Sequence, residues 1–503
     1  DLFRIRNRVR HRFEHNGERI LTDSSITQLK NRATQCAKYI LDSSSILCIS
    51  HIDADGLTSA AIATQAIKRA GIPISTAFSK RLGEPELQQL EKTNYDTILF
   101  TDFGSGQLEQ IIEYGEKGNF TPVICDHHQL SVTPSDSPPL PNDFDFHLNP
   151  LLFGIDGASE LSGAGTCYLL ARALESAGVD NRDLAALAII GAIGDMQARA
   201  EGLIGPNKQI AQEGADKGVL NIKLGLAFYG KQTRPLPKLL EYSSEFGIPG
   251  ISNDSSGAIR FLKNLNIDLR GNGKWKAWAE LSHSEQKTIL NGLVRHSISR
   301  GISPDKINSF VSPIYELENE IIGTELREAN EFSTILNATA RYGRPDVGLS
   351  ICLGDRDKSL SRAKNLLAIH RRNLAEGISL VNRVGVQMEE NFQWFHAEDK
   401  IRDTIVGIVA GMVLGMDGTD PTKPIFAFAK TEEGDLKVSS RGNLSLVKQG
   451  LNLSEIMRLS AQYVGGEGGG HDIAAGATIP LKTEKLFLEQ IKTTLEAQLS
   501  TQG

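Results

Sequence analysis

The chain has 503 residues, 40% of them hydrophobic and 23% charged, which is typical of a globular protein too long for one core, and we expect two to four domains. A net charge of −7 excludes a globally basic nucleic-acid-binding protein, although it leaves room for a local basic groove. Its five cysteines are scattered without a CxxC pair, which argues against structural zinc and favours a cytoplasmic location.

The first part of the chain alternates between two kinds of pattern. Residues 1–41 have the spacing of an N-terminal helical segment, and residues 42–200 alternate between short apolar runs and helical patterns. The runs predict strands at 46–50, 74–78, 97–103 and 122–126, and the patterns predict helices at 58–70, 84–91, 107–116, 163–177 and 183–193. Such alternation favours an α/β fold with a parallel, doubly wound sheet, and the composition of residues 133–141 predicts a surface loop.

The hydrophobic pattern of the rest of the chain predicts three further regions. Residues 201–325 predict a largely helical insert, residues 326–390 a connector helix region, and residues 391–503 a second, smaller α/β domain. In that domain, residues 405–414 are apolar but short and Gly-interrupted, so they predict a buried helix, and we expect no membrane partner. The final expectation is a hairpin of strands at 425–429 and 436–439, followed by a helix and a Gly-rich loop at 465–470.

Carboxylate and imidazole side chains gather where the expected strands end. His51, Asp53 and Asp55 follow the first strand, Asp102 the third, and Asp126, His127 and His128 the fourth. Ligands of such sheets bind beyond the carboxyl ends of the strands, so we expect these side chains to converge on one edge. Taken singly, each has a plainer explanation, as a helix N-cap, a turn residue or a surface histidine pair.

The chemistry of this set indicates hard divalent cations. Asp195, at the end of the helix expected at 183–193, adds a further carboxylate, and the set contains no thiolate. Carboxylate and imidazole suit Mn²⁺ or Mg²⁺ better than Zn²⁺, and the ligands suffice for two ions bridged by one carboxylate. Such a pair clamps a phosphoryl group and activates water, so the residues alone predict metal-dependent hydrolysis of a phosphoester.

A second group of polar residues lies in the last domain. Ser439 and Arg441 end an expected strand, and Gly469, Gly470 and His471 close the Gly-rich run. A Gly-rich loop before a helix can hold phosphate on its backbone N–H groups, and arginine can bind phosphate in a bidentate way. The alternative for the Gly-rich run is a flexible linker.

The ordered motifs resemble those of a known family. They are SHIDADG at 50–56, TDFG at 101–104, CDHH at 125–128, LSGAGT at 161–166, GAIGD at 191–195 and GGGHDIAAG at 468–476. Together they resemble the DHH phosphoesterase superfamily, and within it the RecJ-like single-strand exonucleases, whose accessory DHHA1 domain carries the last motif. The stretch FYGKQTRPL at 228–236 and the helical insert resemble the archaeal branch of that family.

The resemblance implies a role for each residue of the two groups. His51, Asp53 and Asp102 would hold one divalent cation, and Asp55, Asp102, His127 and Asp195 would hold a second, both Mn²⁺ or Mg²⁺. His128 would face the scissile phosphate, with Asp126 as its catalytic companion. Substrate phosphate would be bound from the accessory domain by Ser439, Arg441, Gly469, Gly470 and His471.

The resemblance also implies a function. We expect an exonuclease for single-stranded DNA or RNA, with a role in DNA replication or repair. One alternative is a phosphodiesterase for short oligonucleotides, which the large insert disfavours because a small substrate needs no long groove. The other is a replication component that binds the GINS complex.

Overall fold

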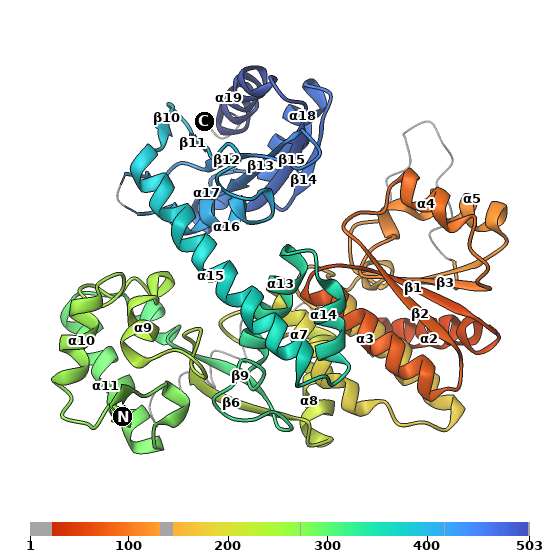
Figure 1. The fold of residues 1–503 in the computed structure, drawn as a ribbon, viewed down its shortest axis with the longest axis horizontal. Helices are drawn as coiled ribbons and strands as arrows, with labels where there is room; N and C mark the ends of the chain where they lie inside the picture. Colours follow the sequence, from red (N-terminus) through yellow and green to blue (C-terminus); the bar gives the residue numbers. More distant parts are fainter. Residues whose placement is uncertain (1–22, 131–143, 272, 417, 501–503) are drawn as a thin grey trace. The chain divides into compact units, whose positions relative to one another are not determined.

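The computed structural model describes residues 23–130, 144–271, 273–416 and 418–500 (Figure 1). The chain divides into two compact units, one ending at Ala363 and one beginning at Lys364. Within the expected N-terminal segment, α2 (Asp23–Leu41) is a helix, whereas residues 1–22 and the loop expected at 133–141 lie outside the described residues. The finer domain boundaries expected from the sequence stay a prediction.

The first unit contains a five-stranded parallel sheet in the order β2-β1-β3-β4-β5. The strands are β1 (Ile46–His51), β2 (Ile74–Ser79), β3 (Thr97–Thr101), β4 (Thr121–Cys125) and β5 (His147–Leu148). The first four confirm the strands expected from the apolar runs, while β5 has only two residues, which is too short for a periodic pattern.

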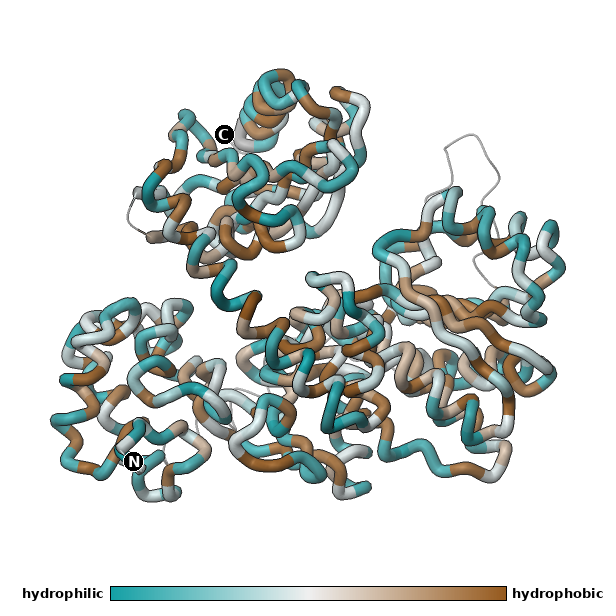
Figure 2. Tube along the Cα trace, viewed as in Figure 1, coloured by the Kyte–Doolittle hydropathy of each residue, from teal (hydrophilic) through white to brown (hydrophobic). Residues whose placement is uncertain are grey.

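Helices cover both faces of this sheet, which confirms the doubly wound α/β fold (Figure 1). The helices are α3 (Ala54–Arg69), α4 (Glu84–Leu90), α5 (Leu108–Gly118), α6 (Gly163–Ala173) and α7 (Ala185–Gly194). Leu47, Phe100 and Ile124 pack into a core cluster with the side chains of α4 and α5. α2, α3 and α6 contact the sheet from the other side, and α7 packs on α3 and α6. Because both faces are buried, β1 and β3 are almost continuously apolar (Figure 2).

The strand order places three carboxyl ends side by side. β1, β3 and β4 are neighbours, with Ser50 beside Thr101 and Thr101 beside Cys125 in the register. The residues that follow these strands therefore emerge at one edge of the sheet.

The insert is largely helical, as expected. Its helices are α8 (Gly205–Asp216), α9 (Leu236–Glu241), α10 (Ser255–Lys263), α11 (His283–Ser299) and α12 (Pro304–Asn308). Two strands missed by the helical patterns, β6 (Leu220–Leu226) and β9 (Val311–Leu317), pair antiparallel. A second short pair, β7 (Arg270–Gly271) and β8 (Lys274–Trp275), forms a hairpin. Three further helices follow, α13 (Ala329–Arg341), α14 (Pro345–Cys352) and the long α15 (Lys358–Val384).

The second unit is built on a mixed sheet in the order β10-β11-β12-β13-β15-β14. Its strands are β10 (Gln387–Met388), β11 (Gln393–His396), β12 (Ile425–Lys430), β13 (Leu436–Arg441), β14 (Glu467–Gly470) and β15 (Ala474–Ile479). Its helices are α16 (Asp403–Val413), α17 (Leu444–Lys448), α18 (Leu453–Tyr463) and α19 (Glu484–Ser500). α18 and α19 share a core with one face of the sheet, and α16 with the other. The expected hairpin is confirmed by β12 and β13.

The Gly-rich run differs from the expected loop before a helix. Its residues Glu467–Gly470 form the edge strand β14, antiparallel to β15. A Cβ added at Gly468 would lie 2.4 Å from the carbonyl oxygen of Met457 in α18. Glycine is therefore needed here because the edge strand lies directly against the backbone of a helix.

Two expectations from composition concern helices and cysteines. None of the described helices is both long enough and apolar enough to cross a membrane. All five cysteines are buried thiols, and burial raises the pKa of Cys36 and Cys48 to about 12. Thiols of this kind behave as core residues.

Candidate functional site

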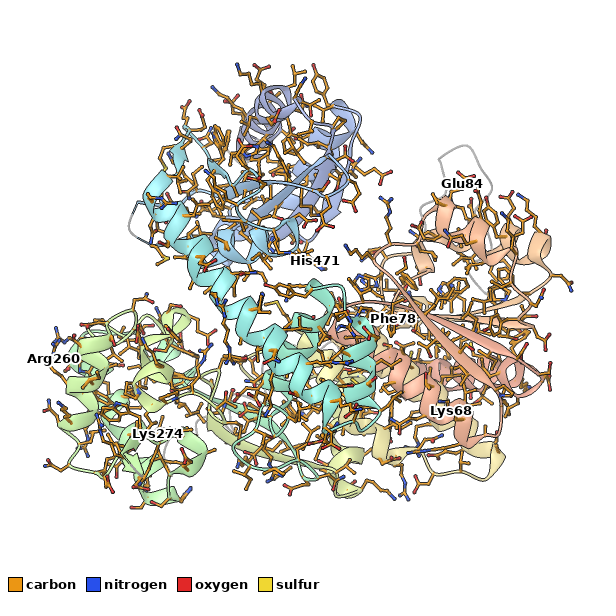
Figure 3. The ribbon with its side chains drawn as sticks, viewed as in Figure 1. Lys68, Phe78, Glu84, Arg260, Lys274 and His471 are labelled. Atoms are coloured by element: carbon orange, nitrogen blue, oxygen red, sulfur yellow. The ribbon has the colours of Figure 1, made fainter. Side chains whose placement is uncertain are left out.

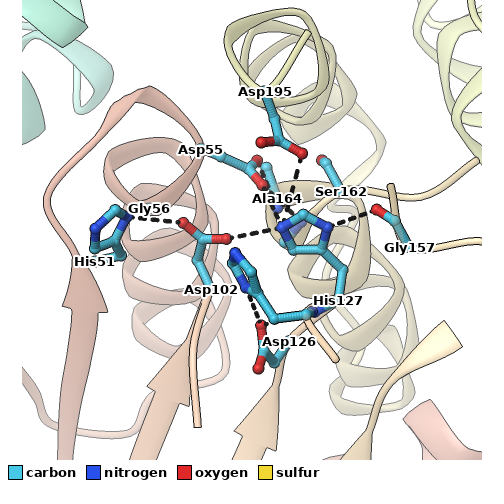
Figure 4. Close-up of polar contacts among 12 residues, drawn as sticks. His51, Asp55, Gly56, Asp102, Asp126, His127, Gly157, Ser162, Ala164 and Asp195 are labelled. Atoms are coloured by element: carbon cyan, nitrogen blue, oxygen red, sulfur yellow. Dashed lines mark hydrogen bonds and ion pairs between the residues drawn. The ribbon is translucent and has the colours of Figure 1, made fainter. Parts of the chain in front are cut away.

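The six expected metal ligands converge at the carboxyl edge of the first sheet. Figure 4 shows His51, Asp55, Asp102, His127 and Asp195 at this edge. They come from the end of β1, the residues after β3 and β4, the first turn of α3 and the end of α7. Their ligand atoms form three groups, each within 4.8 Å: His51, Asp53 and Asp102; Asp55, His127 and Asp195; and Asp102, His127 and His128. Asp102 and His127 each belong to two of these groups.

Asp102 is buried at the centre of the cluster in a strained backbone conformation. Its φ of 62° is in the left-handed region, which only a few per cent of non-glycine residues adopt. Its backbone N–H donates to the carbonyl of Cys125 at 2.9 Å, which fixes this turn. Its Oδ2 lies 3.5 Å from His51 Nδ1, and its Oδ1 lies 3.2 Å from His127 Nε2. The strained turn thus presents one carboxylate to two histidines.

Asp53 has both of the roles weighed from the sequence. Its Oδ1 caps α3 by accepting a hydrogen bond from Gly56 N at 3.0 Å, while its Oδ2 lies 3.1 Å from His51 Nδ1. Burial raises the pKa of Asp53, but the neighbouring His51 outweighs this and holds it below its usual range. Burial lowers the pKa of His51, and Asp53 and Asp102 together raise it well above normal.

Asp55 is held by the N-terminus of α6, the helix that begins within the LSGAGT motif. Its carboxylate accepts hydrogen bonds from Gly163 N at 2.7 Å and Ala164 N at 3.0 Å. Burial, with the neighbouring Asp102 and Asp195, raises the pKa of Asp55 well above its usual value. A Cβ added at Gly163 would lie 2.6 Å from Asp102 Oδ1, so glycine at that position leaves room for the central carboxylate.

His127 shows that the cluster suits a cation. Its Nδ1 donates to the carbonyl of Gly157 at 2.6 Å, so a neutral ring would point the lone pair of Nε2 at the carboxylates. Nε2 lies 3.2 Å from Asp102, 3.6 Å from Asp55 and 3.8 Å from Asp195. Within the described residues, His127 Nε2 and Asp102 Oδ1 are buried without a hydrogen-bond partner. A bound metal ion would satisfy both atoms and the surrounding negative charge.

Asp126 and His128 form a separate pair beside the cluster. Asp126 is fully buried, and its Oδ1 accepts hydrogen bonds from His128 Nδ1 at 2.8 Å and from the backbone N–H groups of His127 and His128. Its Oδ2 accepts from Ser105 N at 2.9 Å. The His128 side chain is 53% exposed. Burial lowers the pKa of His128, but Asp126 raises it to about 9, so Asp126 orients and charges an outward-facing histidine.

Two polar residues that the sequence patterns did not single out support Asp195. Gln197 Nε2 donates to Asp195 Oδ2 and to the carbonyl of Gly157, both at 2.8 Å. Asn207 Nδ2 in α8 donates in turn to Gln197 Oε1 at 2.6 Å. This chain of hydrogen bonds fixes a ligand that would otherwise lie free at the end of α7, and Gln197 is only two residues from Asp195, the one local signal for it.

α13 supplies two more residues that the sequence patterns missed. Asn337 Oδ1 accepts a hydrogen bond from Ala54 N at 3.0 Å and so holds the turn between Asp53 and Asp55. Arg341 is half-buried near Asp53, and its guanidinium has no hydrogen bond or ion pair within the described part of the chain. Burial lowers the pKa of Arg341, although Asp53 opposes this. Asn337 and Ala54 are 283 residues apart in the sequence, so no local pattern could connect them.

The expected substrate residues lie together in the second unit. Ser439 and Arg441 are two residues apart on β13, so both face the same side of the sheet. Gly476 of β15 pairs with Ser439 on one side and with Gly469 on the other, so Gly469 lies on the same face. Gly470 ends β14, and His471 is exposed in the turn to β15 (Figure 3). The structure therefore groups these five residues at one face and end of the sheet.

The chain matches three known domain families. Residues 45–192 match the DHH family, N-terminal domain, residues 228–311 the DHH-CID domain, and residues 388–497 the DHHA1 domain. An uncharacterized protein of Methanocaldococcus jannaschii, MJ0831, is 31% identical over 458 residues, which are 90% of this chain and 94% of that protein.

Solved structures share the fold at low sequence identity. RecJ in complex with Mn²⁺ from Thermus thermophilus has a TM-score of 0.57 and 17% sequence identity. The match covers 93% of this chain but only 55% of the RecJ chain. CDC45 from Entamoeba histolytica has a TM-score of 0.59 and 12% identity, covering 94% of this chain and 98% of its own. With the three domains in the order of the motifs, and five of the six expected metal ligands inside the first, the chain belongs to the DHH phosphoesterase superfamily and has a RecJ-like fold.

Proposed function

We propose that the protein is an exonuclease that hydrolyses the phosphodiester bonds of single-stranded DNA, RNA or both, in DNA replication or repair. The observation that carries this proposal is Asp102, whose two carboxylate oxygens face His51 and His127. A carboxylate shared between two ligand groups is the arrangement in which two ions clamp one phosphoryl group.

We assign two divalent cations, Mn²⁺ or Mg²⁺, to the cluster. One would be held by His51, Asp53 and Asp102, and the other by Asp55, Asp102, His127 and Asp195. The fit is supported by the carboxylate and imidazole donors, by the unsatisfied Asp102 Oδ1 and His127 Nε2 among the described residues, and by the Mn²⁺ of the similar Thermus RecJ. The ions would supply Lewis acidity toward a phosphoryl oxygen and lower the pKa of water.

The chain's own residues would position and neutralise the phosphate. His128, protonated at neutral pH and held by Asp126, would donate from Nε2 to an oxygen of the scissile phosphate. Arg341, which has no ion-pair partner of its own among the described residues, would add a second positive charge beside Asp53.

We assign binding of the strand's backbone to the face of the second sheet. Arg441 can hold a phosphate in a bidentate way, with Ser439 as a neighbouring hydroxyl donor. Gly469 and Gly470 have no side chains to obstruct a backbone, and His471 is exposed at the turn beside them. Residues of this kind bind phosphate and sugar without reading bases, which suits an exonuclease that must accept any sequence.

Degradation of end-labelled strands tests the proposal. DNA and RNA oligonucleotides labelled at the 5′ or the 3′ end are incubated with the full chain and Mn²⁺ or Mg²⁺. We expect mononucleotides to be released progressively from one end, and no loss of a double-stranded control. Asp102→Asn should abolish the activity, while Asp216→Asn, a matched change at an exposed position in α8, should leave it intact. Intact strands, or internal cleavage, would contradict the proposal.

The likeness in fold to CDC45 favours a second candidate, a component of the replication machinery, and the motif resemblance implies the GINS complex as its partner. Asp102→Asn separates the two roles, because a binding role needs no hydrolysis. Capture of purified GINS by both the wild type and Asp102→Asn would support it, and absence of capture by both would contradict it. A third candidate, a phosphodiesterase for short oligonucleotides, is favoured only if a dinucleotide is hydrolysed faster than a long strand.

A further inference from the structure

One face of the second sheet is covered only in part by helices. In β15, Ala475, Ala477 and Ile479 are buried in the core shared with α18 and α19, whereas the alternate residues on the other face stay half-exposed. α16 packs on that other face over β12 and β13, where Gly407 lies against the buried Ser439. The half-exposed residues of this face, which we call the open face, are Lys437, Arg441, Gly469, Ala474, Gly476 and Thr478.

Lys437 is the member of the open face that no motif had singled out. It lies on β13 two residues before Ser439 and four before Arg441, so the three side chains leave the same face. At the rise of an extended strand, Lys437 and Arg441 are separated by about 13 Å between Cα atoms. Lys437 and Arg441 therefore place two positive charges near the two ends of β13, with Ser439 between them.

Within the described residues, Asp403 is near enough to act on the charge of Lys437 but does not pair with it. The side chain is half-buried, and its ammonium group makes no hydrogen bond or ion pair in this part of the chain. Burial lowers the pKa of Lys437 and the nearby Arg441 lowers it further, while Asp403 at the start of α16 opposes both. A partly desolvated ammonium group on the same strand as a guanidinium is unfavourable alone, and binding of an anion relieves this cost.

We propose that Lys437 is a further phosphate-binding residue for the nucleic-acid strand, which contacts the backbone at a second point beyond Arg441. The inference rests on the proposed function, since it takes the substrate to be a strand. A Cβ added at Gly476 would lie 3.3 Å from Lys437 Nζ, so glycine leaves room there for the ammonium group, and the space above the neighbouring Gly469 is open to a phosphate backbone. Two cations so far apart favour an extended polyanion over a single phosphate group.

The salt dependence of strand binding tests this role. Binding of a labelled single strand to the full chain is measured by fluorescence anisotropy in EDTA, which prevents cleavage, over a range of salt concentrations. Each phosphate contact contributes about −0.7 to the slope of log K against log salt for single strands. Lys437→Gln should weaken binding and reduce the magnitude of the slope by about 0.7, whereas Lys437→Arg should keep both near wild type.

Lys430→Gln is the matched control. Lys430 ends the neighbouring strand β12, pairs with Glu398 at 2.6 Å, and lies opposite Leu436, whose side chain is in the core of the other face. Its removal should leave the slope unchanged. Lys437→Met, which keeps the aliphatic stem, gives the same readout should the Gln variant fold poorly. A wild type that binds no strand overturns the proposed function, whereas wild-type slopes in both Lys437→Gln and Lys437→Met overturn only the role of Lys437.

Discussion

His128 is more exposed than His51 and His127 of the neighbouring cluster, and its charge depends on one buried neighbour. Burial alone would lower its pKa, but the hydrogen bond to Asp126 raises the pKa to about 9. We predict that His128→Gln lowers kcat by about 10²- to 10⁴-fold, the usual contribution of a positioned acid, because the donor to the phosphate is lost. Steady-state hydrolysis of a labelled strand measures this effect.

The pH profile separates this role from a structural one. The protonated ring is the active form, so activity should fall as the pH rises through the pKa near 9. Asp126→Asn removes the charge that raises this pKa, and the alkaline limb should then move to lower pH. An unshifted limb in Asp126→Asn, or a kcat of His128→Gln close to that of the wild type, would be evidence against the assignment.

His147 makes the stability of the first unit depend on pH. It is fully buried in β5, with Nε2 2.9 Å from Ser105 Oγ, and burial lowers its pKa from 6.5 to about 4. Between pH 6.5 and pH 4 the unfolded chain binds a proton that the folded chain does not, so stability falls as the pH decreases. The loss amounts to about 3 kcal/mol across the whole window.

Replacement of His147 should remove that loss. Urea unfolding of wild type and His147→Gln, both in EDTA, gives the free energy of unfolding at each pH. The wild-type curve should drop below neutral pH by about 2–3 kcal/mol more than the variant curve, because the other titrating groups are common to both. Parallel curves would show that His147 titrates normally.

At the scale of elements, site residues are predicted best from the sequence where they directly follow a predicted strand. Asp102 and Asp126 stand immediately after apolar runs, so the pattern that predicts β3 and β4 also places both residues at the sheet edge. Asn337 and Arg341 were missed because their helix reaches the site only through tertiary packing. The loop predicted for the glycines at 468–470 is wrong, because the contact of β14 with α18 that requires glycine is equally non-local.

Gly407 lies in the apolar helix α16, where the absence of a side chain leaves space for residues of β13. A Cβ there would lie 2.7 Å from Arg441 Nη2 and 3.0 Å from Ser439 Oγ, so the helix leaves room for both substrate residues. We predict that Gly407→Ala lowers strand affinity several-fold by displacing Arg441. Alanine favours a helix by about 1 kcal/mol over glycine, but the 3.0 Å approach to Ser439 Cβ opposes this gain in stability.

Gly411→Ala is the control for this helix. It is the same substitution one turn later, where an added Cβ would lie 3.7 Å from Arg441 Cγ, an ordinary contact. Anisotropy and thermal unfolding of both variants should therefore show lost affinity for Gly407→Ala and retained affinity for Gly411→Ala. Equal affinities would mean that the guanidinium does not need the space above Gly407.

At the scale of the whole molecule, the two units carry different parts of the proposed chemistry. The three ligand groups found among the described residues all lie in the unit that ends at Ala363. The open face belongs to the unit that begins at Lys364, which has its own cores on both sides of its sheet. Binding of metal and binding of the strand's backbone should therefore be separable by mutation.

Hydrogen exchange with and without Mn²⁺ can test this division in the intact chain. A ligand at about 100 times its Kd stabilises the unit that binds it by about 2.7 kcal/mol, which slows exchange through unfolding of that unit by about 100-fold. We predict slower exchange in β1, β3 and β4, with β12, β13 and β15 unchanged. Asp102→Asn should remove the effect, since this residue belongs to two of the ligand groups. Equal protection of both sheets by Mn²⁺ would show instead that the metal acts on the chain as one cooperative body.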